Sequence, residues 1–252
     1  MTIKNNFPYP KEEYAQFLKD TYADINGLEL FQDEKNWESQ KWSAAVNCSR
    51  GKVLEKAGFC ILHVCGGTIN EIPASVTLFQ TLAYPANPRI PGFIIMTNMN
   101  ETKGMGKILV SYLDLIIQDG NAHEKEKKLF SDTARNICSK HGHNYEEYHA
   151  FLQGRNLLGG SAGECGLLCF LEEKDMLFAD DLIRRLLTAY RDILEMVKNE
   201  KPHQEDFEKR NRVRARLVEW IITEDYGVKV ARENGIPLEV LEAYAFPPVV
   251  HY

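Results

Sequence analysis

The spacing of hydrophobic and polar residues changes near the middle of the chain. Up to about residue 117, apolar residues come in short runs bounded by glycine, proline or polar turns, which predicts β-strands. The predicted strands cover residues 51–67 (two strands or one bent strand), 76–84, 93–99 and 107–117. Turn-forming segments between them favour antiparallel hairpins. Ahead of the strands we expect a helix over residues 10–24 and an irregular stretch over residues 26–50.

The second half of the chain has mainly helical periodicity. One strand, over residues 166–171, follows a glycine-rich loop at 156–166. The predicted helices cover residues 123–141, 145–152, 180–198 and 205–227, with a shorter helix near Pro237. Strands followed by helices predict an α+β fold, with a central and mainly antiparallel β-sheet covered by helices. We expect residues 1–252 to form one domain, with residues 1–45 as an N-terminal helix and irregular lead-in.

Arginines interrupt the apolar stripe of the helix predicted over residues 205–227. On a helical wheel, Arg210 and Arg214 fall near the middle of the stripe, and Arg216 falls at its edge or outside it. A guanidinium group facing the core is costly unless it meets an anion. That anion can be a carboxylate of the chain itself or an acidic ligand held by two hydrogen bonds.

Composition narrows the range of functions. The chain has 30 basic and 36 acidic residues, a net charge of −6, and no long basic block. Nucleic acid and anionic membranes are therefore not the expected partners. The N-terminal residues lack the apolar core of a signal peptide, and no apolar run approaches the length of a membrane span. Six cysteines without a regular spacing indicate reduced thiols, so we expect a cytoplasmic protein.

Asp114 is the acidic residue with the most unusual setting. It lies within the apolar segment ILVSYLDLII, and strand alternation places it on one face with Tyr112 and Ile116. A carboxylate in such a place needs a partner or has a raised pKa. It is either the structural partner of a buried arginine or a general base and acceptor for a ligand N–H.

Other motifs have ordinary interpretations. Cys60, His63 and Cys65 do not project to one side of a strand, and four convergent metal ligands are not visible, so no metal site is expected. The loop at 159–163 could present backbone amides to an anion, although it matches no nucleotide-binding motif and the favoured interpretation is a mobile connector. Ser161 lacks the strand–turn–helix setting of a hydrolase nucleophile.

Several short motifs in order along the chain resemble the oxygen-dependent coproporphyrinogen III oxidases. They cover residues 53–58 (VLEKAG), 87–91 (NPRIP), 138–142 (CSKHG), 214–220 (RARLVEW), 225–227 (DYG) and 241–248 (LEAYAFPP). The resemblance spans about residues 45–252. It implies an antiparallel sheet between two layers of helices, usually in a homodimer. It also implies oxidative decarboxylation by O2 without a metal or organic cofactor. In that family an aspartate engages the pyrrole N–H and arginines hold the acidic side chains. Asp114 matches the aspartate, and Arg214 and Arg216 match arginines of the late helix.

The chain departs from the family pattern around this aspartate. Ser111, Tyr112 and Leu113 replace a glycine triplet, and their side chains are expected to intrude on a flat macrocycle. The family histidine falls at Ile94 or Met96, and a neighbouring arginine falls at Asn98 or Asn100.

These departures lead to two hypotheses for function. The first is an O2-dependent oxidase or decarboxylase of an electron-rich, pyrrole- or indole-like carboxylate other than coproporphyrinogen. Asp114 would be its base, and Arg214 with Arg210 and Arg216 would bind the carboxylate. Asn98 and Tyr112 would contact the substrate. The second is a non-catalytic tetrapyrrole-binding or dimer-partner protein on the same scaffold.

Overall fold

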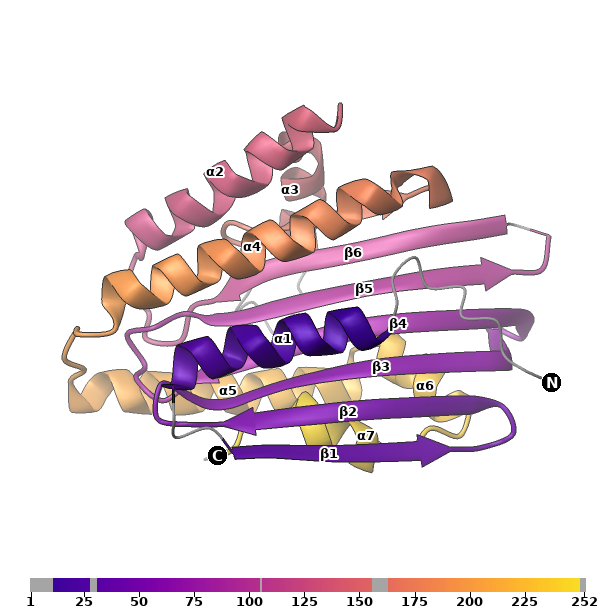
Figure 1. Cartoon of the computed structure of the whole chain (residues 1–252), viewed down its shortest axis with the longest axis horizontal. Helices are drawn as coiled ribbons and strands as arrows, with labels where there is room; N and C mark the ends of the chain where they lie inside the picture. Colours follow the sequence, from indigo (N-terminus) through magenta and orange to yellow (C-terminus); the bar gives the residue numbers. More distant parts are fainter. Residues whose placement is uncertain (1–10, 28–30, 105, 156–162, 250–252) are drawn as a thin grey trace.

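Seven antiparallel strands form a single sheet in which each strand pairs with the next one along the chain (Figure 1). The computed structural model describes residues 11–27, 31–104, 106–155 and 163–249. The strands are β1 (Phe31–Glu38), β2 (Trp42–Arg50), β3 (Leu54–Ile69), β4 (Ile72–Pro85), β5 (Gly92–Thr102), β6 (Gly106–Ile116) and β7 (Leu167–Leu171). The predicted α+β fold with an antiparallel sheet is confirmed.

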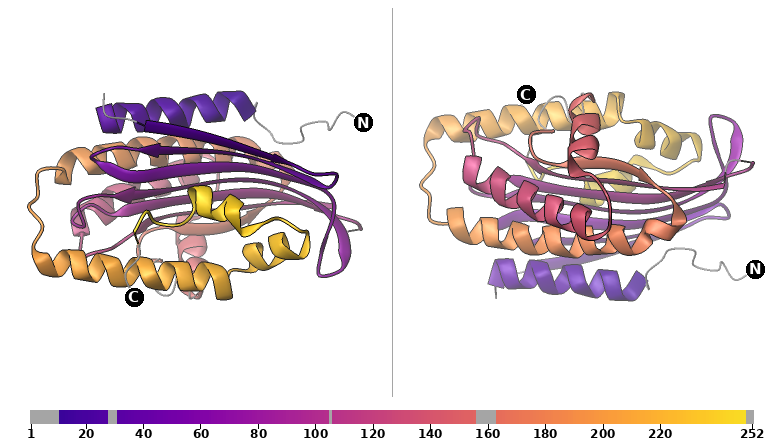
Figure 2. Two further views of the ribbon diagram at one scale, coloured as in Figure 1. Left: turned by 90° about the horizontal axis from the view of Figure 1, so that it is seen from below. Right: turned by 90° about the horizontal axis from the view of Figure 1, so that it is seen from above.

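Helices cover both faces of the sheet, so the molecule has three layers (Figure 2). One face carries α1 (Lys11–Asn26), α2 (Glu124–Lys140) and α4 (Met176–Val197), and α3 (Tyr145–Gln153) lies by β7. The other face carries α5 (Gln204–Thr223), α6 (Tyr226–Glu233) and α7 (Leu238–Tyr244). The 3₁₀ turn η3 (Glu173–Asp175) joins β7 to α4.

Strand alternation separates two hydrophobic cores. On β5, Phe93 and Ile95 face α2 and α4, whereas Ile94 and Met96 face α5–α7. Because the central strands are buried on both faces, their sequences are nearly continuous apolar runs without alternating polar positions. This pattern is why β4, β5 and β6 are predictable from sequence, and why residues 51–67 emerge as one long strand with irregular pairing near each end.

The expectation that residues 26–50 are irregular is wrong, because they contain β1 and β2. Strand β1, with the sequence FQDEKNWE, is the edge of the sheet, and most of its described side chains are exposed. An edge strand with charged side chains discourages pairing with another chain but shows no apolar periodicity. Helix α6 was also missed, because the predicted arginine helix continued past the end of α5 at Thr223 to residue 227, just inside the start of α6.

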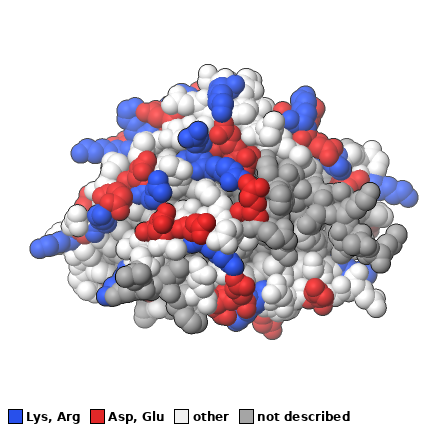
Figure 3. All heavy atoms as spheres, in the orientation of Figure 1, with Lys and Arg blue, Asp and Glu red and all other residues white. Residues whose placement is uncertain are grey.

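The surface charge and the apolarity of the helices complete the description of the fold. Acidic and basic side chains are interspersed over the face seen in Figure 3, without a broad patch of one sign. Within the described part of the chain, no helix has the length and apolarity needed to cross a membrane.

Candidate functional site

The main cavity of the described structure lies between the sheet and the layer formed by α5, α6 and α7. It has a volume of about 470 Å³, within the range of about 300–1,000 Å³ that is usual for small-molecule sites. Alternate residues of β3–β6 form its flat wall, and most of these are aliphatic. The opposite wall comes from the three helices, including Trp220 and Val228. The cavity is therefore a largely apolar slot beside a sheet.

Two polar side chains of the sheet wall bring unsatisfied groups into this apolar surrounding. Tyr112 on β6 is 3% exposed, and its hydroxyl makes no hydrogen bond of normal geometry among the described residues. Asn98 on β5 donates from Nδ2 to Asn100 Oδ1 at 3.0 Å, and its own Oδ1 is buried without a partner. Both side chains line the cavity. Each unmade hydrogen bond of a buried group costs about 1–3 kcal/mol, so both groups are suited to a ligand.

The other polar groups of the cavity have partners or lie near its mouth. Tyr244 on α7 donates a hydrogen bond to Gln80 Oε1 at 2.8 Å. Asp225 caps α6, since its Oδ1 accepts from Val228 N at 2.8 Å. Glu224 and Arg155 are exposed, and the Arg155 guanidinium stacks over the ring of Phe151.

Asp114 lies on the same sheet face but is closed off from solvent by the segment that precedes β7. Its Oδ2 accepts from Gly163 N at 2.5 Å, its Oδ1 accepts from Leu115 N at 2.9 Å, and Cys165 Sγ lies 3.6 Å from Oδ1. Burial raises the pKa of Asp114 to about 6, although these hydrogen bonds act in the opposite direction.

Gly166 makes this close packing possible. A Cβ at that position would lie 2.5 Å from Asp114 Cγ and would overlap the Leu113 carbonyl oxygen. The glycine-rich loop thus presents one backbone amide to an anion, as the sequence allowed, but the anion is the carboxylate of Asp114. Ser161 and residues 156–162 lie outside the described residues.

Asp114 also affects Tyr112, the neighbouring side chain on the same sheet face that lines the cavity. Burial raises the pKa of Tyr112 well above its usual value, and the nearby Asp114 carboxylate raises it further. The phenol is therefore held in its neutral form, in which it can donate a hydrogen bond.

The two arginines of the α5 stripe face the end of the sheet. Arg214 is 1% exposed and donates to Glu55 Oε2 at 2.8 Å, to Pro85 O at 2.9 Å and to Gln118 Oε1 at 3.2 Å. Arg210 donates to Ala86 O at 2.7 Å. Both guanidinium groups are thus satisfied by the chain itself, which is the structural alternative that the sequence left open. Arg216 is exposed on the outer side of α5.

The structure does not bring all the predicted site residues together. Asn98 and Tyr112 line the cavity, whereas Asp114, Arg210 and Arg214 are absent from its wall. The expectation of one hollow shared by the acid and the two arginines is wrong, because each of the three already has partners elsewhere in the protein. Their assignment to catalysis or substrate binding stays a prediction, as does that of Arg216.

The glycine-triplet replacements also separate by face. The hydroxyl groups of Ser111 and Thr97 pair at 3.1 Å, and Leu113 belongs to the core under α2 and α4. Of the three residues expected to intrude on a ligand, only Tyr112 reaches the cavity. The reason is the two-residue period of the strand.

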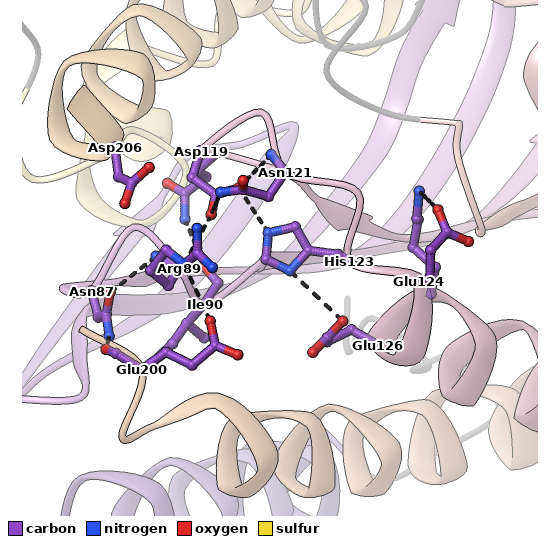
Figure 4. Close-up of polar contacts among 12 residues, drawn as sticks. Asn87, Arg89, Ile90, Asp119, Asn121, His123, Glu124, Glu126, Glu200 and Asp206 are labelled. Carbon is purple, nitrogen blue, oxygen red and sulfur yellow. Dashed lines mark hydrogen bonds and ion pairs between the residues drawn. The ribbon is translucent and has the colours of Figure 1, made fainter. Parts of the chain in front are cut away.

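A second polar cluster joins three loops at the end of the sheet where β5 begins (Figure 4). Asp119 Oδ1 lies 2.7 Å from His123 Nε2, and Arg89 lies between Asp119 and Glu200 at 3.7 and 3.1 Å. Burial favours a higher pKa for Asp119, but hydrogen bonds from His123 and Asn121 outweigh it and lower the pKa to about 2. These groups form hydrogen bonds and ion pairs with one another, so the cluster links the three loops.

Sequence reasoning missed several cavity residues. Gln80 was recoverable, since alternation along β4 places it on the same face as Leu78 and Leu82. Trp220 and Tyr244 reach the cavity because of the way α5 and α7 pack on the sheet, and the local sequence does not predict that packing. Among the described residues, no group of three or more histidine, cysteine or acidic side chains is arranged to hold a metal ion.

The fold has a counterpart among solved structures. Phytochromobilin synthase from tomato, in complex with biliverdin, matches 91% of this chain and 83% of its own, with a TM-score of 0.53 and 10% sequence identity. This likeness shows the fold alone. No family model and no curated protein matches the chain, so the resemblance to coproporphyrinogen III oxidases rests on the short motifs.

Proposed function

We propose that this protein binds a tetrapyrrole or a smaller pyrrolic molecule in the cavity between the sheet and α5–α7. The observation that carries the proposal is the apolar slot of about 470 Å³ whose wall holds two buried, unsatisfied polar groups, on Asn98 and Tyr112. A flat aromatic ligand suits a wall of alternate strand residues, and a few placed polar groups fix its orientation. The structural neighbour from tomato, which was solved with biliverdin, supports this ligand class.

Absorbance titration tests the proposal directly. The purified protein is titrated with biliverdin, coproporphyrin and protoporphyrin, and binding is expected to shift the pigment absorbance with a saturating isotherm. A blocking variant, Val110→Trp, places a large side chain in the sheet wall and is expected to abolish the shift. The matched control, Leu177→Trp, alters an exposed position on α4 and should leave binding intact. Absence of a spectral change with all three pigments, for a folded protein, would refute the proposal.

Oxygen-dependent oxidation of the bound molecule is the second candidate function. It is favoured by Asp114, a buried acid with a pKa of about 6 that lies beside Tyr112 on the cavity face. A carboxyl group that titrates near neutral pH is suited to general acid–base catalysis. The test follows oxygen uptake with pyrrolic and indolic acids. Turnover should be lost in Asp114→Asn, and turnover unchanged in that variant would exclude the assigned role.

Three further sequence-based expectations accompany this proposal. We propose that the reaction, if present, uses O2 without a metal or organic cofactor, that the protein forms a homodimer and that it is cytoplasmic. Light scattering of the purified protein tests the dimer, and metal analysis together with activity after chelation tests the cofactor requirement.

A further inference from the structure

The sheet wall of the cavity has one unsatisfied acceptor and one unsatisfied donor on adjacent strands. In the register of β5 and β6, Asn98 pairs with Val110 and Met96 pairs with Tyr112, so Asn98 and Tyr112 are diagonal neighbours on one face. Diagonal neighbours lie about 7–8 Å apart between Cα atoms, within reach of long side chains. Asn98 Oδ1 can only accept a hydrogen bond, and the neutral Tyr112 hydroxyl can donate one.

The charged side chains that line the cavity do not favour a ligand carboxylate in its interior. Its described lining includes one cationic side chain, Arg155, and two acidic ones, Glu224 and Asp225. Arg155 is exposed and stacks on Phe151, so it can meet an anion only at the mouth. A carboxylate taken into the apolar interior would lose its hydration without gaining a cation, which is strongly unfavourable.

We propose that the cavity selects a ligand whose buried part is uncharged and carries an N–H next to a carbonyl, the edge that a pyrrolinone lactam presents. Asn98 Oδ1 accepts from the ligand N–H and the Tyr112 hydroxyl donates to its carbonyl oxygen. Any carboxylates of the ligand stay at the solvent-facing mouth. This assignment rests on the proposed function, because it specifies the class of pyrrolic molecule that the cavity takes.

Biliverdin and its dimethyl ester separate this proposal from the parent one. The two pigments share the lactam rings and differ in two carboxylate charges. If the proposal is correct, the dissociation constant of the ester is no more than threefold higher than that of the acid. Preference for the acid by more than threefold would overturn the neutral-ligand assignment while leaving pigment binding established. Binding of neither pigment would overturn the neutral-ligand assignment, and it would overturn the proposed function as well if coproporphyrin and protoporphyrin also failed to bind.

Two variants test the residues themselves. A neutral hydrogen bond contributes about 0.5–1.5 kcal/mol, so Tyr112→Phe and Asn98→Leu should each weaken ester binding about 2- to 12-fold. Unchanged affinity in either variant would refute the paired recognition. Because the Tyr112 hydroxyl is unsatisfied, Tyr112→Phe should not lower the melting temperature of the free protein. The control Tyr190→Phe removes a satisfied hydrogen bond to Pro91 O on the opposite face, so it should lower stability without changing affinity.

Discussion

Replacement of Arg214 by methionine tests whether this arginine stabilises the fold or waits for a ligand. The side chain is 1% exposed, and its guanidinium donates to Glu55 Oε2, Pro85 O and Gln118 Oε1. Methionine has a similar length but no donor. The change therefore leaves two buried acceptors and one partly exposed carboxylate without their partner.

The expected loss of stability follows from these three contacts. An unsatisfied buried acceptor costs about 1–3 kcal/mol, which applies to Pro85 O and to Gln118 Oε1. The Glu55 side chain is 29% exposed, so water can replace part of its ion pair and that loss is at most about 1 kcal/mol. The total is about 4 kcal/mol, in the range measured when one partner of a buried pair is removed. For a chain of this size it corresponds to a decrease in Tm of about 8–16 °C.

Denaturant unfolding of the wild type and Arg214→Met, followed by circular dichroism, measures this loss. Arg216→Met is the matched control on the same helix, and because Arg216 is exposed its effect should stay within about 0.5 kcal/mol. Arg214→Lys keeps the charge but cannot reproduce the planar fork, so it should fall between the two.

A loss below about 1 kcal/mol in Arg214→Met would refute the structural role. If pigment binding were weakened at the same time, the prediction from sequence that Arg214 holds a ligand carboxylate would be favoured instead. A large loss of stability together with retained pigment binding would favour the assignment made from the structure.

Three further predictions follow from buried groups. The pKa of Asp114 is raised from 3.8 to about 6, so its contribution to stability is present below about pH 4 and is lost by about pH 6. Urea titrations should show the wild type losing about 3 kcal/mol of unfolding free energy relative to Asp114→Asn over that interval. A constant difference between the two proteins would refute the shift. The pH dependence from Asp119 runs in the opposite direction, because its pKa is lowered to about 2. Its contribution of about 2 kcal/mol to the free energy of unfolding is present above pH 4 and decreases toward pH 2. His123→Ala should reduce this pH dependence in acid unfolding curves. Gly166→Ala should cost more than about 2 kcal/mol because its Cβ meets Asp114 Cγ at 2.5 Å, whereas Gly154→Ala, with its nearest contact at 3.5 Å, should be neutral; equal melting temperatures would contradict the packing.

The elements that the sequence predicts well are those whose burial leaves a pattern in the chain. Strands β3–β6 are buried on both faces, and α4 carries an apolar stripe. Strand β1 has no such pattern, since it lies at the edge of the sheet and most of its described side chains are exposed. Helix α6 begins where the Asp225 side chain caps a new turn, and periodicity alone did not distinguish that break from a continuing helix.

The site shows a similar division. Alternation correctly placed Tyr112 and Asp114 on one face, but it could not show that a cavity forms over Tyr112 while a loop closes over Asp114. The helical wheel correctly turned Arg214 toward the core. Its partner Glu55 is 159 residues away in sequence, and nothing local identifies a pairing over that separation.

Three of the motifs that resemble the coproporphyrinogen oxidases, at residues 53–58, 214–220 and 241–248, lie where α5 and α7 contact the sheet. Lys56 Nζ donates to the backbone oxygen of Glu242 at 2.9 Å, at the C-terminal end of α7. Gly58 lets the backbone of Tyr244 approach, since a Cβ there would lie 2.7 Å from Tyr244 Cα. Together with the Arg214 network, these contacts hold α5 and α7 against β3 and β4. These three motifs therefore reflect how the helices pack on the sheet.

The positions that depart from the family pattern lie in a different part of the molecule. Asn98 and Tyr112 face the cavity, and neither takes part in fastening the helices. Tyr244 belongs to both groups, since it packs against Gly58 and also lines the cavity. The hydrogen bonds of Lys56 and Arg214, however, do not involve Asn98 or Tyr112. A chain can thus resemble an oxidase in its packing motifs and still have a neutral donor and acceptor in its cavity wall. We therefore propose that the choice of ligand is decided at Asn98 and Tyr112, whereas a role of the α5 arginines in ligand binding stays a prediction.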